Sequence, residues 1–532
     1  MLILQGATYT HPNRDLLFNN LNLTIQKYHK IALIGHNGAG KSTLLKILAG
    51  DLPLLSGVVK AETAPYYVPQ LFGQYNDYTV AKSLRVDEKI TALYEILNGI
   101  VTDENLTLLS DDWTIEERCA AALNHWGLPQ LDLNQKMRDL SGGQKMKVFL
   151  AGIMIHQPKI VLLDEPSNHL DLEGRTMLYE YIKSTSSTLV VVSHDRTLLN
   201  LLDTICELNK NGITTYGGNY DFYLAQKTIE DEALVFNLRN EEKALRKAKD
   251  IEKASLERQQ KLDARGKKKQ EKAGLSRISM NTLKNNAEKS TAKIKRVHTE
   301  KVGEISIGLK QLRTEVGDIE KMKVGFDHSL FHRGKILITA QDLNFGYSNT
   351  TLWAKPLNFS IGAGERIALK GVNGSGKTTL IRLILGQLIP QHGALKSSVT
   401  NAIYIDQDYT LIDNSLTVYE HAQLNNSGEF QEHEVKTRLN RFLFTKELWD
   451  KPCIALSGGE KMRLMLCCLT IAVKAPDLII LDEPTNNLDI QNLEILTAAI
   501  QAYKGILVVV SHDEYFLKQI SIERSIMVST ET

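Results

Sequence analysis

The stretch IALIGHNGAGKST at residues 31–43 decides the fold of this chain. IALIG is a short apolar run that predicts a buried parallel strand, and LLKIL at 44–48 has helical character. Between them lies the pattern GxxxxGK[ST], whose glycines let backbone N–H groups converge on phosphate oxygens at a helix N-terminus. We therefore predict a phosphate-binding loop within an α/β sheet.

The chain is an internal duplication. The stretch recurs as IALKGVNGSGKTT at residues 367–379, an offset of 336 positions. LSGGQKMK at 140–147 is echoed by LSGGEKMR at 456–463, and VLLDEPSNHLD at 161–171 by IILDEPTNNLD at 479–489. The same motif order, present twice, predicts two homologous domains rather than a solenoid of short repeats.

In each phosphate loop the lysine would reach the β and γ phosphates of a nucleotide, and the hydroxyl after it would ligate Mg²⁺. The candidate nucleotide-binding residues of the two loops are Gly35, His36, Asn37, Gly38, Ala39, Gly40, Lys41, Ser42, Thr43, Gly371, Val372, Asn373, Gly374, Ser375, Gly376, Lys377, Thr378 and Thr379.

Two carboxylates follow four apolar residues in each half, at the C-terminal end of a predicted strand, where ligands gather in α/β sheets. Asp164 can hold Mg²⁺, and Glu165 is suited to orient or deprotonate an attacking water. Asp482 and Glu483 repeat the pair. After a phosphate loop, this pattern predicts hydrolysis of a nucleotide.

LSGGQ and LSGGE, placed between the phosphate loop and the acidic pair, resemble the signature of ATP-binding-cassette (ABC) ATPases. A Ser-Gly-Gly alone is also typical of a flexible turn, but before a helical run it offers backbone donors at a helix N-terminus. In that family two cassettes pair head to tail around ATP. The resemblance implies one site from Lys41 with Ser457, Gly458 and Gly459, and another from Lys377 with Ser141, Gly142 and Gly143.

Further site residues follow from the same resemblance. It implies that Gln70 and Gln407 sense Mg²⁺ and the attacking water, that His194 and His512 contact the γ-phosphate, and that Tyr347 stacks on adenine. His11 stands where the first half would carry the matching aromatic residue. The implied Mg²⁺ ligands are Ser42, Asp164, Gln70, Thr378, Asp482 and Gln407.

Composition excludes several classes of protein. The chain has 532 residues, no run of 18 apolar residues, and no basic segment before an apolar core at its start, so we expect neither a membrane span nor a secretory signal. Five cysteines without a CxxC pair are typical of a reducing cytoplasm. The net charge of +1 hides a basic insert, since residues 231–310 hold 21 Lys and Arg against 12 Asp and Glu.

The insert predicts two helices and a basic turn. Residues 229–264 contain no Gly or Pro and predict a helix of about 54 Å, and a second helix is predicted over about 286–324. A projecting antiparallel hairpin follows, with a solvated coiled-coil spacer as the alternative. Its candidate RNA-binding residues are Lys267, Lys268, Lys269, Lys272 and Arg277, beside the bulky Leu275, Ile278, Met280 and Leu283 at the apex.

Two cassettes joined by such a linker resemble the ABC-F family, and YGGNYDFYLAQK at 216–227 resembles its handover into the linker. The resemblance implies a cytoplasmic functional monomer that binds ATP and Mg²⁺ and enters the exit-tRNA site of the ribosome, where the linker contacts peptidyl-site tRNA and ribosomal RNA. A factor that relieves stalled translation and one that protects ribosomes from antibiotics both remain open. The alternatives are an ATPase subunit for a separate membrane transporter and a DNA-associated ATPase.

The expected domains are a first cassette over 1–222, the basic linker over 223–326 and a second cassette over 327–532. The first cassette holds about 21 more residues than the second between its Gln and its signature, within 71–125. A small arm or a larger helical subdomain accounts for this excess equally well.

Overall fold

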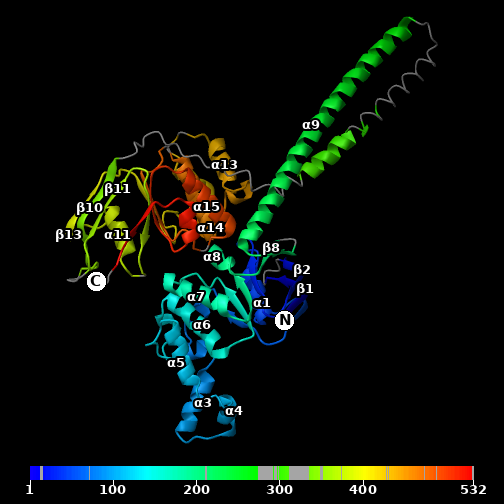
Figure 1. Cartoon of the computed structure of the whole chain (residues 1–532). Helices are drawn as coiled ribbons and strands as arrows, with labels where there is room; N and C mark the ends of the chain where they lie inside the picture. The colour runs from blue at the N-terminus through cyan, green and yellow to red at the C-terminus, as the bar shows by residue number, and fades with distance from the viewer. Residues whose placement is uncertain are drawn as a thin grey trace. The chain divides into compact units, whose positions relative to one another are not determined.

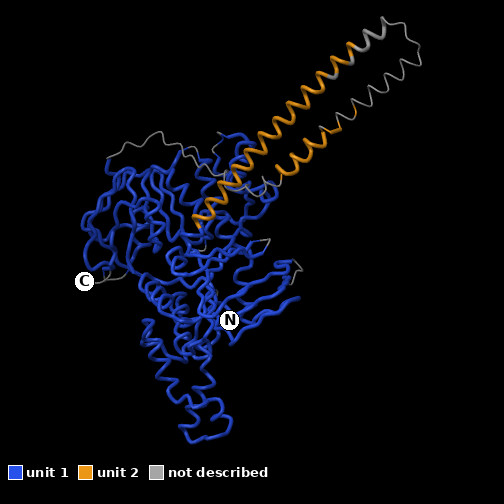
Figure 2. The backbone as a smooth tube through the Cα atoms, turned by 45° about the vertical axis from the view of Figure 1, so that its right-hand side comes forward, with its two compact units in different colours: residues 1–223, 324–532 blue, residues 224–323 orange. Residues whose placement is uncertain are grey.

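The computed structural model describes residues 1–11, 16–70, 72–209, 212–272, 292, 296–297, 299–310, 335–347, 351–372, 374–426, 428, 430–472, 474–486 and 488–529. The chain divides into two compact units, of which one comprises 1–223 with 324–532 and the other 224–323 (Figure 2). Among the helices of the described ranges, none has the length and apolar character needed to cross a membrane.

The first half is built on a six-stranded sheet in the order β5-β6-β7-β3-β8-β9. Its three central strands are apolar and buried, and all neighbours are parallel except β8 and β9. Its strands are β3 (Lys30–Ile34), β5 (Tyr66–Val68), β6 (Ile160–Asp164), β7 (Thr188–Val192), β8 (Thr204–Asn209) and β9 (Gly212–Gly217). A separate antiparallel sheet, β2-β1-β4, comprises β1 (Leu2–Thr10), β2 (Leu16–Ile25) and β4 (Ser56–Ala61).

The second half repeats this plan, with a parallel sheet in the order β14-β15-β16-β12-β17 and an antiparallel sheet β11-β10-β13. The parallel strands are β12 (Arg366–Lys370), β14 (Ala402–Ile405), β15 (Leu478–Asp482), β16 (Ile506–Val510) and β17 (Arg524–Met527). The antiparallel strands are β10 (Ile336–Asn344), β11 (Leu357–Gly362) and β13 (His392–Ser397). The duplication predicted from the motifs is therefore also a duplication of strand order.

Helices flank both sheets (Figure 1). Those of the first half are α1 (Lys41–Ala49), α2 (Val80–Ser83), α3 (Asp87–Leu97), α4 (Asp103–Leu109), α5 (Ile115–His125), α6 (Gly142–His156), α7 (Leu172–Ser184) and α8 (Arg196–Leu199). Those of the second half are α11 (Lys377–Ile384), α12 (Val418–Leu424), α13 (Glu432–Arg441), α14 (Gly458–Ile471), α15 (Ile490–Ala502) and α16 (Glu514–Gln519). Short 3₁₀ turns lie at Gly73–Tyr75, Met137–Asp139, Lys446–Leu448 and Cys453–Ala455.

The extra residues of the first half form the pair α3 and α4, which pack against each other (Figure 1). In the second half a single loop separates α12 from α13, where the first half places this pair between α2 and α5. The tip of the pair exposes Leu97, Ile100 and Val101. The excess is thus a small helical arm that rests on α2 and α5.

The second unit contains all but the first turn of the long helix α9 (Tyr220–Lys272), together with helical residues over 299–310. The expected helix end at 264 was wrong, because one glycine at 266 costs about 1 kcal/mol and the lysines around it are good helix formers. Leu238 and Leu309 are buried against each other, so the two segments lie side by side (Figures 1 and 2).

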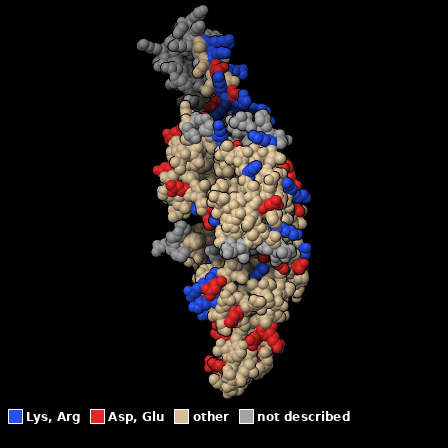
Figure 3. All heavy atoms as spheres, turned by 90° about the vertical axis from the view of Figure 1, so that its left-hand side faces the viewer, with Lys and Arg blue, Asp and Glu red and all other residues tan. Residues whose placement is uncertain are grey.

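Only the first part of the expected basic apex is described by the structure. Lys267, Lys268, Lys269 and Lys272 fall within the last turns of α9, whereas Arg277 and the apolar residues at 275–283 lie outside the described residues. Figure 3 shows Lys and Arg side chains gathered along the described part of α9.

Candidate active site

The first phosphate loop connects β3 to α1. Gly40 caps α1 with φ at +96°, and a Cβ there would lie 2.6 Å from the Phe18 ring, so only glycine fits. The buried Lys41 ammonium donates to the carbonyl oxygens of Gly35 at 2.7 Å and His36 at 3.2 Å. Burial lowers the pKa of Lys41, and the nearby Glu165 carboxyl opposes that shift.

The second phosphate loop, between β12 and α11, repeats this geometry. Gly376 has φ at +91°, and Lys377 donates to the carbonyl oxygens of Gly371 at 2.8 Å and Val372 at 3.1 Å. Asn373, predicted to bind nucleotide, lies outside the described residues. In both loops the lysine ammonium therefore donates to carbonyl oxygens of its own loop. When a nucleotide binds, phosphate oxygens would replace these carbonyl oxygens as acceptors.

The residues at the end of β6 fit a magnesium ion. The Ser42 hydroxyl donates to Asp164 Oδ1 at 3.1 Å, and the Tyr67 hydroxyl donates to Asp164 Oδ2 at 3.1 Å. Two adjacent oxygens that share an octahedral Mg²⁺ at about 2.1 Å would lie about 3.0 Å apart, close to the spacing of Ser42 and Asp164. Burial raises the pKa of Asp164, and the hydrogen bonds from Ser42 and Tyr67 oppose the shift.

In the second half Asp482 accepts a hydrogen bond from the Tyr404 hydroxyl at 2.8 Å. Thr378 makes no such bond to Asp482 in the part of the chain that the structure describes. No cluster of three or more His, Cys, Asp or Glu suited to a metal occurs among the described residues.

Glu165 and His194 form a buried pair behind the first phosphate loop. His194 Nε2 lies 3.3 Å from Glu165 Oε1, and the His194 backbone N–H donates to Oε2 at 3.3 Å. Burial raises the pKa of Glu165 to about 8 and lowers the pKa of His194 to about 3. A carboxyl whose pKa lies near neutrality is suited to take a proton from water.

The matching pair in the second half is Glu483 and His512, whose side chains lie 3.5 Å apart. Burial raises the pKa of Glu483 to about 7 and lowers the pKa of His512 to about 4. Glu165 and Glu483 both adopt positive φ, at +51° and +47°, directly after a strand. Each half therefore presents its acid at the same backbone turn.

A cavity of about 550 Å³ collects the residues predicted for the first site. It contains the phosphate loop, Glu165 and Gln70, together with Ser457 from the second half. Its lining residues are His11, Leu17, Asn37, Gly38, Gly40, Lys41, Ser42, Thr43, Gln70, Asp164, Glu165, Val192, His194 and Ser457. Gly458 and Gly459 do not line it.

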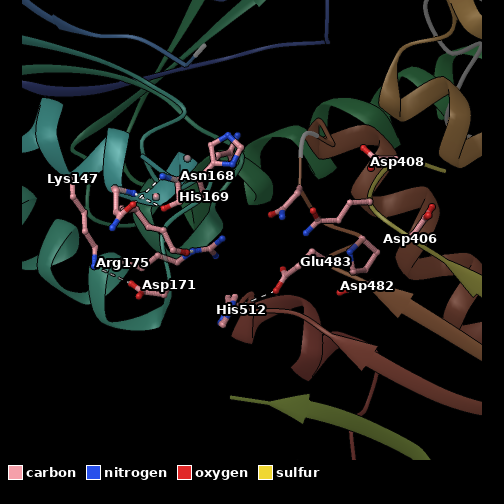
Figure 4. A pocket seen from close by; sticks show the side chains of 18 of the residues that line it. Lys147, Asn168, His169, Asp171, Arg175, Asp406, Asp408, Asp482, Glu483 and His512 are labelled. Atoms are coloured by element: carbon pink, nitrogen blue, oxygen red, sulfur yellow. Dashed lines mark hydrogen bonds and ion pairs between the residues drawn. The ribbon is translucent and has the colours of Figure 1, made fainter. Parts of the chain in front are cut away.

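A second cavity of about 790 Å³ brings the signature of the first half to the acids of the second half (Figure 4). Lys377 does not line this cavity, but Ser141, Gly142 and Gly143, its predicted partners, do. The lining residues are Ser141, Gly142, Gly143, Gln144, Lys147, Asn168, His169, Leu170, Asp171, Arg175, Asp406, Gln407, Asp408, Tyr409, Asp482, Glu483, Pro484, Asn486 and His512.

The signatures are fixed by reciprocal helix caps. The Ser141 hydroxyl accepts from the Gln144 backbone N–H at 3.2 Å, and the Gln144 side chain accepts from the Ser141 N–H at 2.9 Å. Ser457 and Glu460 make the same capping box at the start of α14. Gln and Glu are interchangeable at this signature position because either side chain completes the box.

Direct contacts join the two halves beside these cavities. The Asn37 backbone N–H donates to Asp489 Oδ2 at 3.0 Å. The buried Arg196 donates to Gln519 Oε1 at 2.5 Å and lies 4.9 Å from the centre of the Tyr515 ring.

The adenine side of the sites differs between the halves. Tyr347 is 67% exposed, and its hydroxyl lies 3.0 Å from Thr379 Oγ1 at the phosphate loop. In the first half His11 and Leu17 line the cavity instead. Stacking of Tyr347 on adenine stays a prediction.

Four residues of these sites were not predicted from the sequence: Tyr67, Tyr404, Asp489 and Arg175. Asp489 could have been predicted, because the repeated motifs NHLD and NNLD stand directly before α7 and α15. The tyrosines lie on β5 and β14, each three residues before Gln70 or Gln407, and nothing in that apolar pattern marks a hydroxyl for a carboxylate.

Known proteins resemble this chain over most of its length. A family model described as ABC transporter matches residues 18–168 and 354–486. The putative ATP-binding protein YdiF of Bacillus subtilis (strain 168) is 30% identical over 98% of this chain and 79% of its own. The ABC transporter F family member 5 of Arabidopsis thaliana is 30% identical over 93% of this chain and 70% of its own.

Among solved structures, a chain in the crystal structure of the complex of the archaeal ribosomal stalk protein aP1 and the archaeal ribosome recycling factor aABCE1 has the same fold as this chain. Its TM-score is 0.61 at 20% identity, with 98% of this chain and 87% of that chain covered.

Proposed function

This chain belongs to the F family of ATP-binding-cassette ATPases, and from that premise we propose that it couples ATP binding and hydrolysis to an action on the ribosome. Its two cassettes close head to tail within one monomer, and each closed site takes residues from both halves. The basic linker of 223–326 then acts on peptidyl-site tRNA and ribosomal RNA from the exit-tRNA site.

One observation carries the composite sites: Ser457 of the second half lines the same cavity as Lys41 and Glu165 of the first. The second cavity supports the reciprocal arrangement, since Ser141 of the first half lies with Glu483 of the second. A phosphate chain between the two halves would be bound by a lysine from one side and by helix N-terminal donors from the other. ATP would thereby hold the halves together, and hydrolysis would release them.

The residues of each site divide the chemistry. Lys41 would bind the phosphates, and Ser42 with Asp164 would hold Mg²⁺, which neutralises charge on the phosphates. Glu165 would orient the attacking water and take its proton, while His194 fixes the carboxylate. Lys377, Thr378, Asp482, Glu483 and His512 are proposed for the same roles in the second site.

The basic hairpin supports a ribosomal partner. Residues 261–296 hold 12 Lys and Arg against 3 Asp and Glu, which suits a backbone of RNA phosphates. The archaeal ribosome recycling factor shares the tandem-cassette fold and is described in complex with a ribosomal stalk protein. Either relief of stalled translation or displacement of an antibiotic would then be its cytoplasmic task.

The experiment that tests this function uses the double variant Glu165→Gln, Glu483→Gln, which is expected to bind ATP and not hydrolyse it. Purified ribosomes are pelleted through sucrose with this variant in ATP or ADP. Co-sedimentation in ATP and loss in ADP is the expected result. Ribosomes that carry a bound antibiotic, compared with stalled ribosomes, then separate protection from relief.

The control is the wild-type chain in ATP, which should leave the ribosome as it hydrolyses the nucleotide. Absence of the folded, ATP-bound double variant from the pellet contradicts the ribosomal function. Recovery of that variant with membrane fractions would instead support the transporter subunit.

A further inference from the structure

Arg175 is a buried arginine whose guanidinium makes one hydrogen bond within the described residues. It lies in the first turns of α7 and is 7% exposed. Its Nε donates to the Leu170 carbonyl oxygen at 3.3 Å, and its other guanidinium nitrogens make no hydrogen bond within the described residues. A guanidinium has five N–H donors, so most of its donors have no partner in the protein.

The guanidinium lies on the wall of the second cavity. Arg175 comes from the first half, and the same cavity is lined by Glu483 and His512 of the second half (Figure 4). After burial, the charge of Arg175 is the strongest influence on the pKa of Glu483 and also on that of His512, and it lowers both. The positive charge is therefore close to the acid proposed to activate water.

The first site has no counterpart of this arginine. Asp171 and Asp489 both cap the helix that follows them, and four residues later the first half has Arg175 where the second has Leu493. Leu493 is 2% exposed. No arginine is among the groups that shift the pKa of Glu165.

Packing alone does not account for the charge. The leucine in the second half shows that an apolar side chain fills this helix position. No guanidinium nitrogen of Arg175 is among the buried atoms without a partner in the described residues, so its unpaired donors open on the cavity. A planar fork of donors that faces a cavity is suited to bind phosphate oxygens in a bidentate manner.

We propose that Arg175 is a catalytic residue which the first cassette supplies to the second ATP site, where its guanidinium binds the γ-phosphate. As the water oxygen bonds to the γ-phosphorus, the bond from that phosphorus to the β–γ bridging oxygen breaks and ADP keeps the electron pair. The water proton passes to Glu483, and Arg175 neutralises the charge on the transferred group. This inference rests on the second site of the proposed function.

The test isolates the second site with Glu165→Gln and adds Arg175→Leu, which copies the residue of the other half. The expected result is a fall in kcat of roughly 10²- to 10³-fold, the effect of one transition-state donor, with a change of less than about fivefold in the KM for ATP. Arg175→Lys should recover about tenfold of the loss, because it restores the charge without the fork. The control variant is Thr176→Ala, an exposed neighbour on α7.

The outcomes separate the two proposals. If Glu165→Gln alone hydrolyses no ATP, the second site of the proposed function fails. If that variant hydrolyses ATP and Arg175→Leu leaves its kcat within threefold, the role of Arg175 is overturned. If Arg175→Leu raises KM without lowering kcat, Arg175 has a structural role and the proposal is overturned. The same follows if Arg175→Leu lowers kcat equally in the Glu483→Gln background, where only the first site works.

Discussion

The backbone N–H of Asn37 donates to the carboxylate of Asp489 across 3.0 Å and 452 positions of sequence. This bond joins the phosphate loop of the first half to the residue that caps α15 in the second half. Burial raises the pKa of Asp489, but hydrogen bonds from Asn37 and Asn492 outweigh it and hold the pKa below its ordinary value. The carboxylate is therefore ionised in the contact and binds the loop as a charged acceptor.

Asp489→Ala and Thr417→Ala compare this contact with an ordinary helix cap of the same half. Each removes a capping side chain worth about 1 kcal/mol, and Asp489 also accepts from the phosphate loop of the first half. A hydrogen bond to a charged group adds about 1.5–3 kcal/mol. Asp489→Ala should therefore lower the melting temperature by roughly 2–4 °C more than Thr417→Ala, measured by calorimetry at pH 7.

Acidification should remove this difference. A carboxylate with a depressed pKa in the folded protein stabilises it above the unfolded pKa of about 3.9 and loses that contribution as the pH falls through its folded pKa. Equal melting temperatures of the two variants at pH 7 would show that the Asn37 contact does not stabilise the protein.

Glu165→Gln should stabilise the nucleotide-free protein. Burial raises the pKa of Glu165 to about 8, above the ordinary value of 4.5. The folded state then binds a proton that the unfolded state has lost, so stability falls as the pH rises from 4.5 to 8. The gain in melting temperature from Glu165→Gln should be larger at pH 8 than at pH 5, measured in EDTA.

Glu117→Gln is the control for that measurement, since Glu117 is an exposed carboxylate on α5 that is distant in sequence from the phosphate loop. A gain for Glu165→Gln that is the same at both pH values would contradict the raised pKa.

Tyr67→Phe and Tyr404→Phe should weaken magnesium binding at separate sites. Each hydroxyl orients the carboxylate proposed to hold Mg²⁺, at 3.1 Å from Asp164 and 2.8 Å from Asp482. Loss of such an outer partner typically weakens a metal site by about 10- to 100-fold. The Mg²⁺ concentration at half-maximal ATP hydrolysis should rise accordingly in the Glu483→Gln and Glu165→Gln backgrounds.

Tyr66→Phe provides the comparison, because its neighbouring hydroxyl donates to the Phe149 carbonyl oxygen instead. Tyr66→Phe should keep the Mg²⁺ requirement of the parent variant. If Tyr67→Phe also keeps it, Asp164 needs no orienting hydroxyl.

The motifs predicted the fold because the residues of each motif are close together in the sequence. The strand, loop and helix around Lys41 are continuous in sequence, so periodicity and glycine spacing were sufficient to place them. The helix over 229–264 was predicted too short at both ends, since its first turns around Tyr220 are packed and apolar rather than charged.

The contacts between the halves could not be predicted from residue patterns alone. Arg175 and Leu493 occupy equivalent positions, and only the folded chain shows that the arginine faces the acids of the other half. The Asn37 contact with Asp489 joins backbone to side chain across the two domains, and a backbone donor leaves no trace in the sequence.

The composite sites are tested most directly by combining Glu165→Gln with an arginine at one signature serine at a time. Glu165→Gln inactivates the first site, and Ser457→Arg should obstruct the same site, so this pair keeps the hydrolysis of Glu165→Gln alone. Ser141→Arg should obstruct the second site and abolish the remaining hydrolysis. The opposite pattern, with activity lost by Ser457→Arg and kept by Ser141→Arg, would show that each cassette uses its own signature and would contradict the account.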